Sequence, residues 1–452
     1  MSWPPCSIRR VERAWPRSVF RDQPAVTARR RTAGPAAALG LLVALALAGC
    51  RSGTTSQAEA SGRAEPHGWI VLAVGVDNVE RLNRDLLEDV NHESNDLARA
   101  FRGLHPRVGI EIQPFESNVL PQELARRTRD GLAPDLLLVS AGDAHNLAAR
   151  GLIRPLRLPP DRIDHLDPMA LARVRLADGR LLGLPVMLQP QLACFDRRRV
   201  ARSPASWDAL LQRSQEGLRV GLPMQAMSLA WTLRPLGAGS SVKAIASSGR
   251  LNAADQRQLQ SWLERLRDAQ HHHGIQFLAN QDALMRGLIA GELDWVSCRS
   301  DQIASLRKRG LGSRLGVALL PSGPGGPASP LNRLRVLVFG TNSTEPQRQA
   351  AEALGRFSLN PPVQRRILLE HLGLPVTTDP LTVAQRSPLT ASLITAAAQG
   401  ASSETDGLAL RLNHADNANR CRHLLMEFLY GERDSRSASL RLMELLAGEA
   451  SR

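Results

Sequence analysis

The chain has 452 residues, more than one ordinary hydrophobic core accommodates, so two globular domains are expected. With 43% apolar and 22% charged residues, its composition is that of a folded protein and excludes disorder along the whole chain. The formal charge is +14, but residues 1–49 hold eight arginines against Glu12 and Asp22, and the later arginines are interleaved with acidic residues. This distribution is typical of a solvated surface and argues against a nucleic-acid-binding groove.

An export signal is the strongest local pattern in the sequence. Three arginines at residues 29–31 precede an apolar run at 36–48, which is shorter than the roughly 20 residues needed to cross a bilayer. The run ends in the sequence LAGC, whose last residue is Cys50. This ending resembles the bacterial lipoprotein box, in which the cysteine receives a diacylglycerol group before cleavage. An uncleaved anchor or a chance cysteine is the alternative.

The lipoprotein box fixes the expected organisation of the N-terminus. Residues 1–49 are predicted to be a signal peptide, with Cys50 lipidated as the first residue of the mature protein. Residues 50–67 are mostly small and polar, which predicts a flexible tether. We therefore expect an exported protein, lipid-anchored to the bacterial membrane and facing the periplasm or the cell exterior.

Strands and helices alternate along the rest of the chain. Buried or alternating apolar runs predict strands at 69–74, 107–115, 134–140, 180–195, 293–298, 315–320 and 334–340. Helical periodicity is found at 79–103, 121–131, 253–269, 281–290 and 302–308, and Ser206 is a candidate cap for a further helix. Helices fill most of the remainder after residue 340. This alternation indicates parallel sheets with helices on their faces.

Several phrases, taken in order, resemble the extracellular solute-binding proteins of ABC transporters, and specifically the group that binds sugars and oligosaccharides. They are LARAFRGLHP at 97–106, VGIEI at 108–112, GLAPDLLLV at 131–139, NLAARGLIRPL at 146–156, DGRLLGLPV at 178–186, PASWDALL at 204–211, GVALLPSGPGG at 316–326, PPVQRRI at 361–367 and GLPV at 373–376. Each phrase alone is common, but together they cover about residues 69–445 in the family's order.

The resemblance implies an α/β, two-lobed periplasmic-binding-protein-like fold of type II, in which each lobe is a mostly parallel sheet flanked by helices. The ligand is held in the cleft between the lobes, which hinge shut around it. We expect residues 68–180 with about 320–360 to form the first lobe. The second lobe is expected to comprise residues 181–319 with about 361–452, including the C-terminal helices.

Candidate ligand-binding residues lie after the strands and in the segments that cross between lobes. Ligands bind beyond the carboxyl ends of parallel strands, so the loops after residues 74, 113, 139 and 296 are expected to face the cleft. These loops and crossings supply polar groups suited to sugar hydroxyls: Asp77, Glu116, Ser117, Asp143, Gln189, Gln191, Arg299, Ser300, Asp301 and Asn332. Arg299 also suits a carboxylate or a phosphate. Any one such polar residue is more often a cap or a surface group than a ligand contact.

Aromatic residues are scarce, at 4% of the chain, which makes the tryptophans informative. Trp231 lies in the second lobe, where the resembled family often places a ring that stacks on the sugar, and it is the preferred candidate. Trp295 lies inside a predicted strand and is the second candidate. Trp207 and Trp262 are expected to be packing residues.

Other functional classes find little support in the sequence. It contains no nucleophile elbow, Walker loop, dinucleotide fingerprint or zinc-protease motif, so no enzymatic activity and no cofactor are expected. Ferric-ion binding proteins commonly use tyrosines, and Tyr430 is the only one in the chain. The tract His271–His273 is expected to be solvated, and we expect no metal site. Cys194, Cys298 and Cys421 allow at most one disulfide.

The expected function is capture of a small organic solute, sugar-like in character, and its delivery to the permease of an ABC importer. The expected partners are this solute, the permease subunits and the membrane through the N-terminal lipid, with a monomeric protein. The alternative is a degenerate member of the fold that acts as a sensor or a structural lipoprotein.

Overall fold

The computed structural model describes residues 65–76, 84–117, 119–250, 252–377, 387–400, 412 and 415–447, with side chains from residue 94 onward in the first helix. These residues belong to one compact unit, Arg63–Arg452. The predicted signal peptide, Cys50, almost all of the predicted tether and Asp77 lie outside the described residues.

The described strands form one mixed sheet in the order β2-β1-β3-β9-β4-β7-β5-β6, with β8 and β10 also pairing with β4. The strands are β1 (Gly68–Val76), β2 (Val108–Glu116), β3 (Leu136–Ser140), β4 (Leu184–Asp196), β5 (Val220–Pro223), β6 (Ile275–Leu278), β7 (Trp295–Arg299), β8 (Leu315–Ala318), β9 (Asn332–Phe339) and β10 (Leu374–Pro375). Strands β1, β2 and β3 pair in parallel, as do β5, β6 and β7, whereas all pairings of β4 and β9 are antiparallel.

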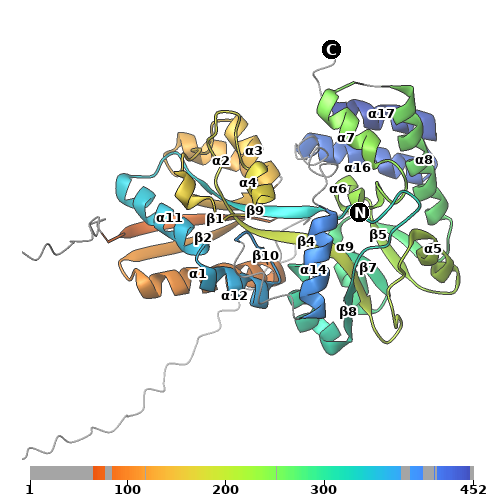
Figure 1. Ribbon diagram of the computed structural model, residues 1–452, viewed down its shortest axis with the longest axis horizontal. Helices are drawn as coiled ribbons and strands as arrows, with labels where there is room; N and C mark the ends of the chain where they lie inside the picture. The colour runs from red at the N-terminus through yellow and green to blue at the C-terminus, as the bar shows by residue number, and fades with distance from the viewer. Residues whose placement is uncertain are drawn as a thin grey trace, which may run out of the picture. The chain divides into compact units, whose positions relative to one another are not determined.

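Strand β4 is the element that both parts of the sheet share, and it runs from one part into the other (Figure 1). Its first residues, from Leu184 to Pro190, pair with β9, and its last residues pair with β7 and β8. All but one of its 13 residues are buried, so the strand is covered on both faces. Pro190 has no N–H to donate to a ladder, and it stands where the pairing partner changes.

The helices divide between the two ends of β4 (Figure 1). With β1, β2, β3, β9 and β10 lie α1 (Arg84–Leu104), α2 (Leu120–Arg129), α3 (Ala141–Ala149), α4 (Pro168–Ala172), α11 (Glu345–Ser358) and α12 (Pro361–His371), which together are here called the first lobe. The second lobe contains β5, β6, β7 and β8 with α5 (Trp207–Gln215), α6 (Ala226–Leu229), α7 (Gly239–Ser248), α8 (Ala253–Gln270), α9 (Gln281–Ala290), α10 (Gln302–Leu306), α14 (Pro388–Gln399), α16 (Ala415–Leu429) and α17 (Ser435–Ala447).

Three apolar clusters form the core. The first packs the β1, β3 and β9 sheet against α1 and α11, with Leu72 and Phe339 among its buried members. The second contains Trp231 and Trp295 and fills the second lobe. The third lies along the second half of β4, around β7, α9 and α14. Helix α12 contributes to the first and third clusters, although the expected boundary at residue 361 assigns it to the second lobe. The residue boundaries of the lobes stay a prediction.

The two-lobed α/β class expected from the sequence is confirmed. The predicted strands and helices in the described part of the chain occur within a few residues of their expected bounds. Ser206 caps α5 as expected, because its side-chain oxygen accepts a hydrogen bond from the backbone N–H of Ala209 at 3.2 Å. The antiparallel course of β4 and β9 was not expected, and it follows from their role as crossing strands.

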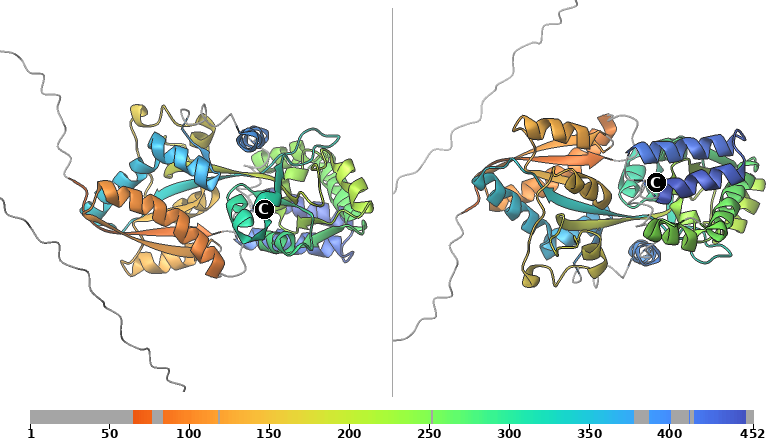
Figure 2. Two further views of the ribbon diagram at one scale, coloured as in Figure 1. Left: turned by 90° about the horizontal axis from the view of Figure 1, so that it is seen from below. Right: turned by 90° about the horizontal axis from the view of Figure 1, so that it is seen from above.

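The C-terminal helices α16 and α17 return to the second lobe and lie beside α7 and α8 (Figure 2). Their apolar faces, with Phe428 and Leu446 fully buried, complete the second cluster. Among the described helices, none is both long enough and apolar enough to span a membrane.

A disulfide joins Cys194 of β4 to Cys298 of β7, two neighbouring strands of the sheet, and closes a sequence separation of 104 residues. Cys421 stays a free thiol in the second cluster, and burial raises its pKa to about 12. A buried disulfide of this kind suits an exported protein, because the cytosol keeps thiols reduced.

We expect the disulfide to add about 2–4 kcal/mol to the free energy of unfolding, because the cross-link lowers the conformational entropy of the unfolded chain. Urea denaturation with and without a reductant measures this difference. The C194A/C298A double variant should resemble the reduced wild type and ignore the reductant, while C421A should keep the wild-type response. An oxidised wild type no more stable than its reduced form would contradict the prediction.

Candidate functional site

A cavity of about 250 Å³ is lined by residues of both lobes. The first lobe contributes residues of β1, α1, β9 and α12, and the second contributes residues of α9, α10 and the end of β7. Much of the first-lobe wall is apolar and includes Leu72, Val74 and Leu97. The polar groups are mostly charged. None of the described lining residues is Trp, Tyr or Phe.

Strands β4 and β9 both line the cavity, and β9 does so with alternate residues. On β9 the lining residues are Arg333, Arg335 and Leu337, while the residues between them belong to the first cluster. Gln189 lies directly opposite Arg333 in the antiparallel ladder, and Met187 opposite Arg335. Directly opposite residues share a face of the sheet, so the strand register itself places these four side chains on the cavity wall.

Asp301 is the carboxylate around which three of the cavity arginines gather. Arg299 donates two hydrogen bonds to it, at 3.1 and 3.0 Å, in a bidentate pair. The nearest guanidinium nitrogen of Arg333 is 3.8 Å from Asp301 Oδ2. Arg335 reaches from β9 over β3 toward β1 and donates to the carbonyl oxygens of Leu138 and Gly75, both at 2.9 Å. The cluster thus joins β7, β9, β1 and β3.

Burial of the Asp301 carboxyl would by itself raise its pKa, but this effect is outweighed by Arg299, Arg333 and Arg335. The pKa of Asp301 is therefore below its usual value, and the group is charged at neutral pH. The position of Arg299 is fixed from the other side as well, because its backbone N–H donates to Gln302 Oε1 at 2.9 Å.

Gln189 offers a hydrogen-bond acceptor to the cavity. Its side chain is 4% exposed, and its amide oxygen has no hydrogen-bond partner in the part of the chain that the structure describes. An unsatisfied buried acceptor is unfavourable unless a ligand or an ordered water supplies a donor. A hydroxyl group of a bound molecule is such a donor.

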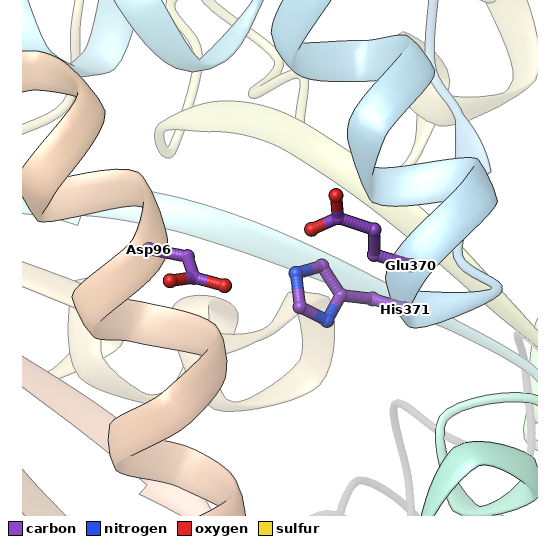
Figure 3. Close-up of side chains that lie close together, drawn as sticks. All are labelled: Asp96, Glu370 and His371. Carbon is purple, nitrogen blue, oxygen red and sulfur yellow. The ribbon is translucent and has the colours of Figure 1, made fainter.

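An ion-pair network closes one edge of the cavity between α1 and α12. Asp96 projects from α1, and Glu370 and His371 project toward it from α12 (Figure 3). These groups are close enough to hold a cation, yet Arg366 also bonds Asp96 at 3.2 Å and Glu370 at 2.6 Å. A guanidinium beside both carboxylates would repel a metal ion, so the cluster is best understood as a bridge between the two helices.

Of the residues proposed from the sequence, Gln189, Arg299 and Asp301 line the cavity together. The others within the described residues do not line it, and the structure gives most of them a different partner. The Asp143 side chain accepts a hydrogen bond from Ser140 at the start of α3, at 2.7 Å. Gln191 donates to the carbonyl oxygen of Ser228 at 2.8 Å. Asn332 donates to that of Ala397 at 2.7 Å, and Glu116 ends β2.

The two tryptophans proposed for stacking lie in the core of the second lobe. The centroid of the Trp231 ring is 6.0 Å from that of Trp207 and 6.3 Å from that of Trp295, and Trp231 is 0% exposed. The indole N–H of Trp295 donates to Ser203 Oγ at 2.9 Å. The structure therefore does not bring either ring to the cavity, because both fill the space between the sheet and its covering helices.

Arg333 and Arg335 line the cavity but were not among the residues proposed from the sequence. The signal that could have found them is their alternation with apolar residues in the sequence NRLRVLVF of β9. In a strand buried along its whole length, two charged residues on one face indicate a polar surface inside the protein.

We expect the Asp301→Asn variant to be about 3 kcal/mol less stable than the wild type at pH 7, because it leaves buried guanidinium groups without their carboxylate. The contribution of Asp301 is present above its unfolded pKa near 3.8 and is lost as the pH falls through the lowered folded value. Urea denaturation at several pH values should show the two proteins converging below about pH 4. A stability difference that does not change on acidification would contradict this assignment.

Comparison with known proteins identifies the family to which the chain belongs. Residues 96–390 match the family described as bacterial extracellular solute-binding protein. A search of the curated proteins found no significant match.

Solved structures share the fold at low sequence identity. The GacH receptor of Streptomyces glaucescens GLA.O, studied unliganded and with acarbose, is 15% identical, with a TM-score of 0.68 over 82% of this chain and 96% of that one. Maltose-bound MalE3 of T. maritima is 16% identical, with a TM-score of 0.62 over 84% and 98%. A solute-binding protein of an ABC transporter from Thermotoga lettingae TMO, bound with α-D-tagatose, is 12% identical, with a TM-score of 0.65 over 84% and 100%. The family match covers more than half of the sequence and these structures share its fold, so the chain belongs to the bacterial extracellular solute-binding proteins.

Proposed function

We propose that the protein is the lipid-anchored solute-binding component of an ABC importer, which captures a small sugar-like solute and delivers it to the membrane permease. The observation that carries this proposal is a cavity lined by both lobes, which share β4 as a common strand. Rotation of the lobes about the crossing segments would enclose a ligand bound there, and the closed form would present a new surface to the permease.

Two observations support a sugar-like solute, and a third supports a small one. The structures similar to this chain include proteins solved with acarbose, maltose and tagatose. The buried amide oxygen of Gln189 suits a hydroxyl donor. The cavity of about 250 Å³ lies slightly below the roughly 300 Å³ at which typical ligand pockets begin, which favours a small ligand over a long oligosaccharide.

The protein is proposed to bind its solute without altering it and to act as a monomer. Membership of an extracellular family agrees with the apolar run at residues 36–48, and the lipoprotein box ending in Cys50 supplies the anchor. The anchored protein would stay close to the permease, and residues 50–67 would allow its lobes to reach it.

A ligand that binds only the folded protein should raise its stability, by about 2.7 kcal/mol at a hundred times the dissociation constant. Thermal unfolding of the purified mature chain against sugars, polyols, amino acids and phosphoesters tests this expectation. We expect a concentration-dependent rise in the melting temperature with one or more sugar-like compounds. No shift across the whole panel would favour the degenerate sensor or structural lipoprotein over the transport function.

Gln189→Leu should weaken binding of the identified solute about tenfold, because one hydrogen bond to a buried acceptor is removed while the side-chain volume is nearly kept. Isothermal titration calorimetry measures the change. Gln212→Leu on α5, whose amide bonds Glu216 at the surface, is the matched control and should bind as the wild type does. Equal affinity in the Gln189 variant would remove this residue from the site.

Cys50 should become labelled when cells that express the full chain are grown with radioactive palmitate. The label should be absent from the Cys50→Ser variant, because the thiol is the acceptor of the diacylglycerol group. Labelling that persists in Cys50→Ser would contradict lipidation at this position.

A further inference from the structure

Basic side chains concentrate on one surface of the second lobe, where β4 ends and β8 begins. Residues 196–202 and 307–314, here called the basic surface, contain eight arginine or lysine residues and a single acidic residue, Asp196. An ordinary solvated surface interleaves charges of both signs, so a local excess of this size indicates a surface that attracts an anionic partner.

Hydrogen bonds join the two segments, which are far apart in the sequence, into one surface. Arg314 bonds Asp196 at 3.2 Å and donates to the carbonyl oxygen of Gly310 at 2.6 Å. The backbone N–H of Arg197 donates to the carbonyl oxygen of Arg314 at 2.8 Å. The ladder between β4 and β8 holds the same ends together, because Asp196 lies opposite Leu315. The basic surface is therefore built on the sheet itself.

The carboxylates within this surface do not balance its cations. Asp196 and the neighbouring Asp294 are both buried, and each is shared by two guanidinium groups. The pairs are Arg198 and Arg314 with Asp196, at 2.8 and 3.2 Å, and Arg219 and Arg199 with Asp294, at 2.6 and 3.9 Å. One negative charge between two positive charges leaves an excess of positive charge at both places.

Four further cations of the basic surface are exposed and have no ion-pair partner among the described residues: Arg197, Arg202, Arg307 and Lys308. Arg213 adds another guanidinium beside them, since it donates to the carbonyl oxygen of Arg202 at 3.0 Å. Exposed cations keep their hydration, so the free protein is stable without a partner. Their combined field still attracts an anionic surface.

The composition of the basic surface favours a lipid partner over a protein partner. Protein interfaces have a core of apolar and aromatic side chains. None of the large exposed apolar residues of the described chain lies within residues 196–202 or 307–314. Anionic lipid headgroups need no such core, because clustered Arg and Lys residues are attracted to them by charge alone, and the attraction grows with each residue.

The proposed anchor brings such a lipid surface within reach. Residues 50–67 span at most about 60 Å when fully extended. A protein held at Cys50 by a tether of that length can turn its second lobe toward the bilayer. We propose that the basic surface binds the anionic phospholipid headgroups of the membrane to which the protein is anchored. Attachment at the second lobe and at the N-terminal lipid would then hold the protein in one orientation on the membrane.

This inference goes beyond the proposed function, because it holds whichever solute is bound. Of residues 196–202 and 307–314, all of which the structure describes, Arg309 is the one that also lines the cavity. Arg309 is therefore left unchanged in the experiments, so that solute binding and lipid binding are measured separately.

Vesicle co-sedimentation tests the inference with the mature chain, residues 50–452, carrying Cys50→Ser so that no lipid is attached. The vesicles contain phosphatidylcholine alone or equal parts of phosphatidylcholine and phosphatidylglycerol. We expect at least about tenfold tighter binding to the anionic vesicles, because several basic residues contribute together. Raising the salt to about 1 M should remove most of the difference, because the Debye length falls from about 10 Å at 0.1 M to about 3 Å.

A triple charge reversal, Arg197→Glu with Arg202→Glu and Lys308→Glu, should weaken binding to the anionic vesicles at least about tenfold. These side chains are exposed, so we expect the variant to fold, and its melting curve checks this. The milder triple change of the same residues to Gln should give a smaller loss in the same direction. Solute binding should equal that of the wild type.

The matched control reverses three cations of the first lobe that are also exposed and have no ion-pair partner among the described residues: Arg102→Glu, Arg129→Glu and Arg365→Glu. Both triple variants have the same net charge, so a difference between them reports position rather than total charge. The control should bind the anionic vesicles as the wild type does.

Three results would overturn the inference. Equal binding to neutral and anionic vesicles would show that headgroup charge has no role, and an equal loss in both triple variants would show that net charge alone matters. Absence of binding to the anionic vesicles at low salt would leave an acidic protein surface as the partner. Each of these results leaves the proposed function intact as long as the protein still binds its solute.

Discussion

The arrangement of this protein depends on one strand that two lobes share. Because β4 pairs with β9 at its beginning and with β7 and β8 at its end, neither lobe completes its sheet without it. The change of partners at Pro190 places the end of β7 close to the start of β9. Those two strand ends carry Arg299 and Arg333, so the crossing strand also assembles the charged cluster around Asp301.

Much of the fold could be predicted from the sequence, and the reason lies in its apolar patterns. Long buried runs such as 134–140 and 334–340 admit few alternatives to a strand, and the order of motifs identified the family. The antiparallel course of β4 could not be predicted. A continuous apolar run predicts a buried strand, but it does not show which strands pair with it or in which direction.

The site was only partly predictable, because residue type does not reveal which side of an element faces a cavity. Gln189, Arg299 and Asp301 were proposed because they lie in a crossing segment or just after a strand, and all three line the cavity. Trp231 was a reasonable choice on chemical grounds, but its indole ring packs between two other tryptophans in the second cluster. The alternation of Arg333 and Arg335 with apolar residues indicates a polar face of β9, but the pairing register is needed to show that this face lines the cavity.

The central claim is that the charged cavity holds the solute between the two lobes, and a crystal structure of the protein with its tightest-binding compound tests it most directly. The account predicts that the compound contacts residues of both lobes and places a hydroxyl group within hydrogen-bond distance of the amide oxygen of Gln189. A compound bound away from these side chains, with the cavity filled by solvent at saturating ligand, would contradict it.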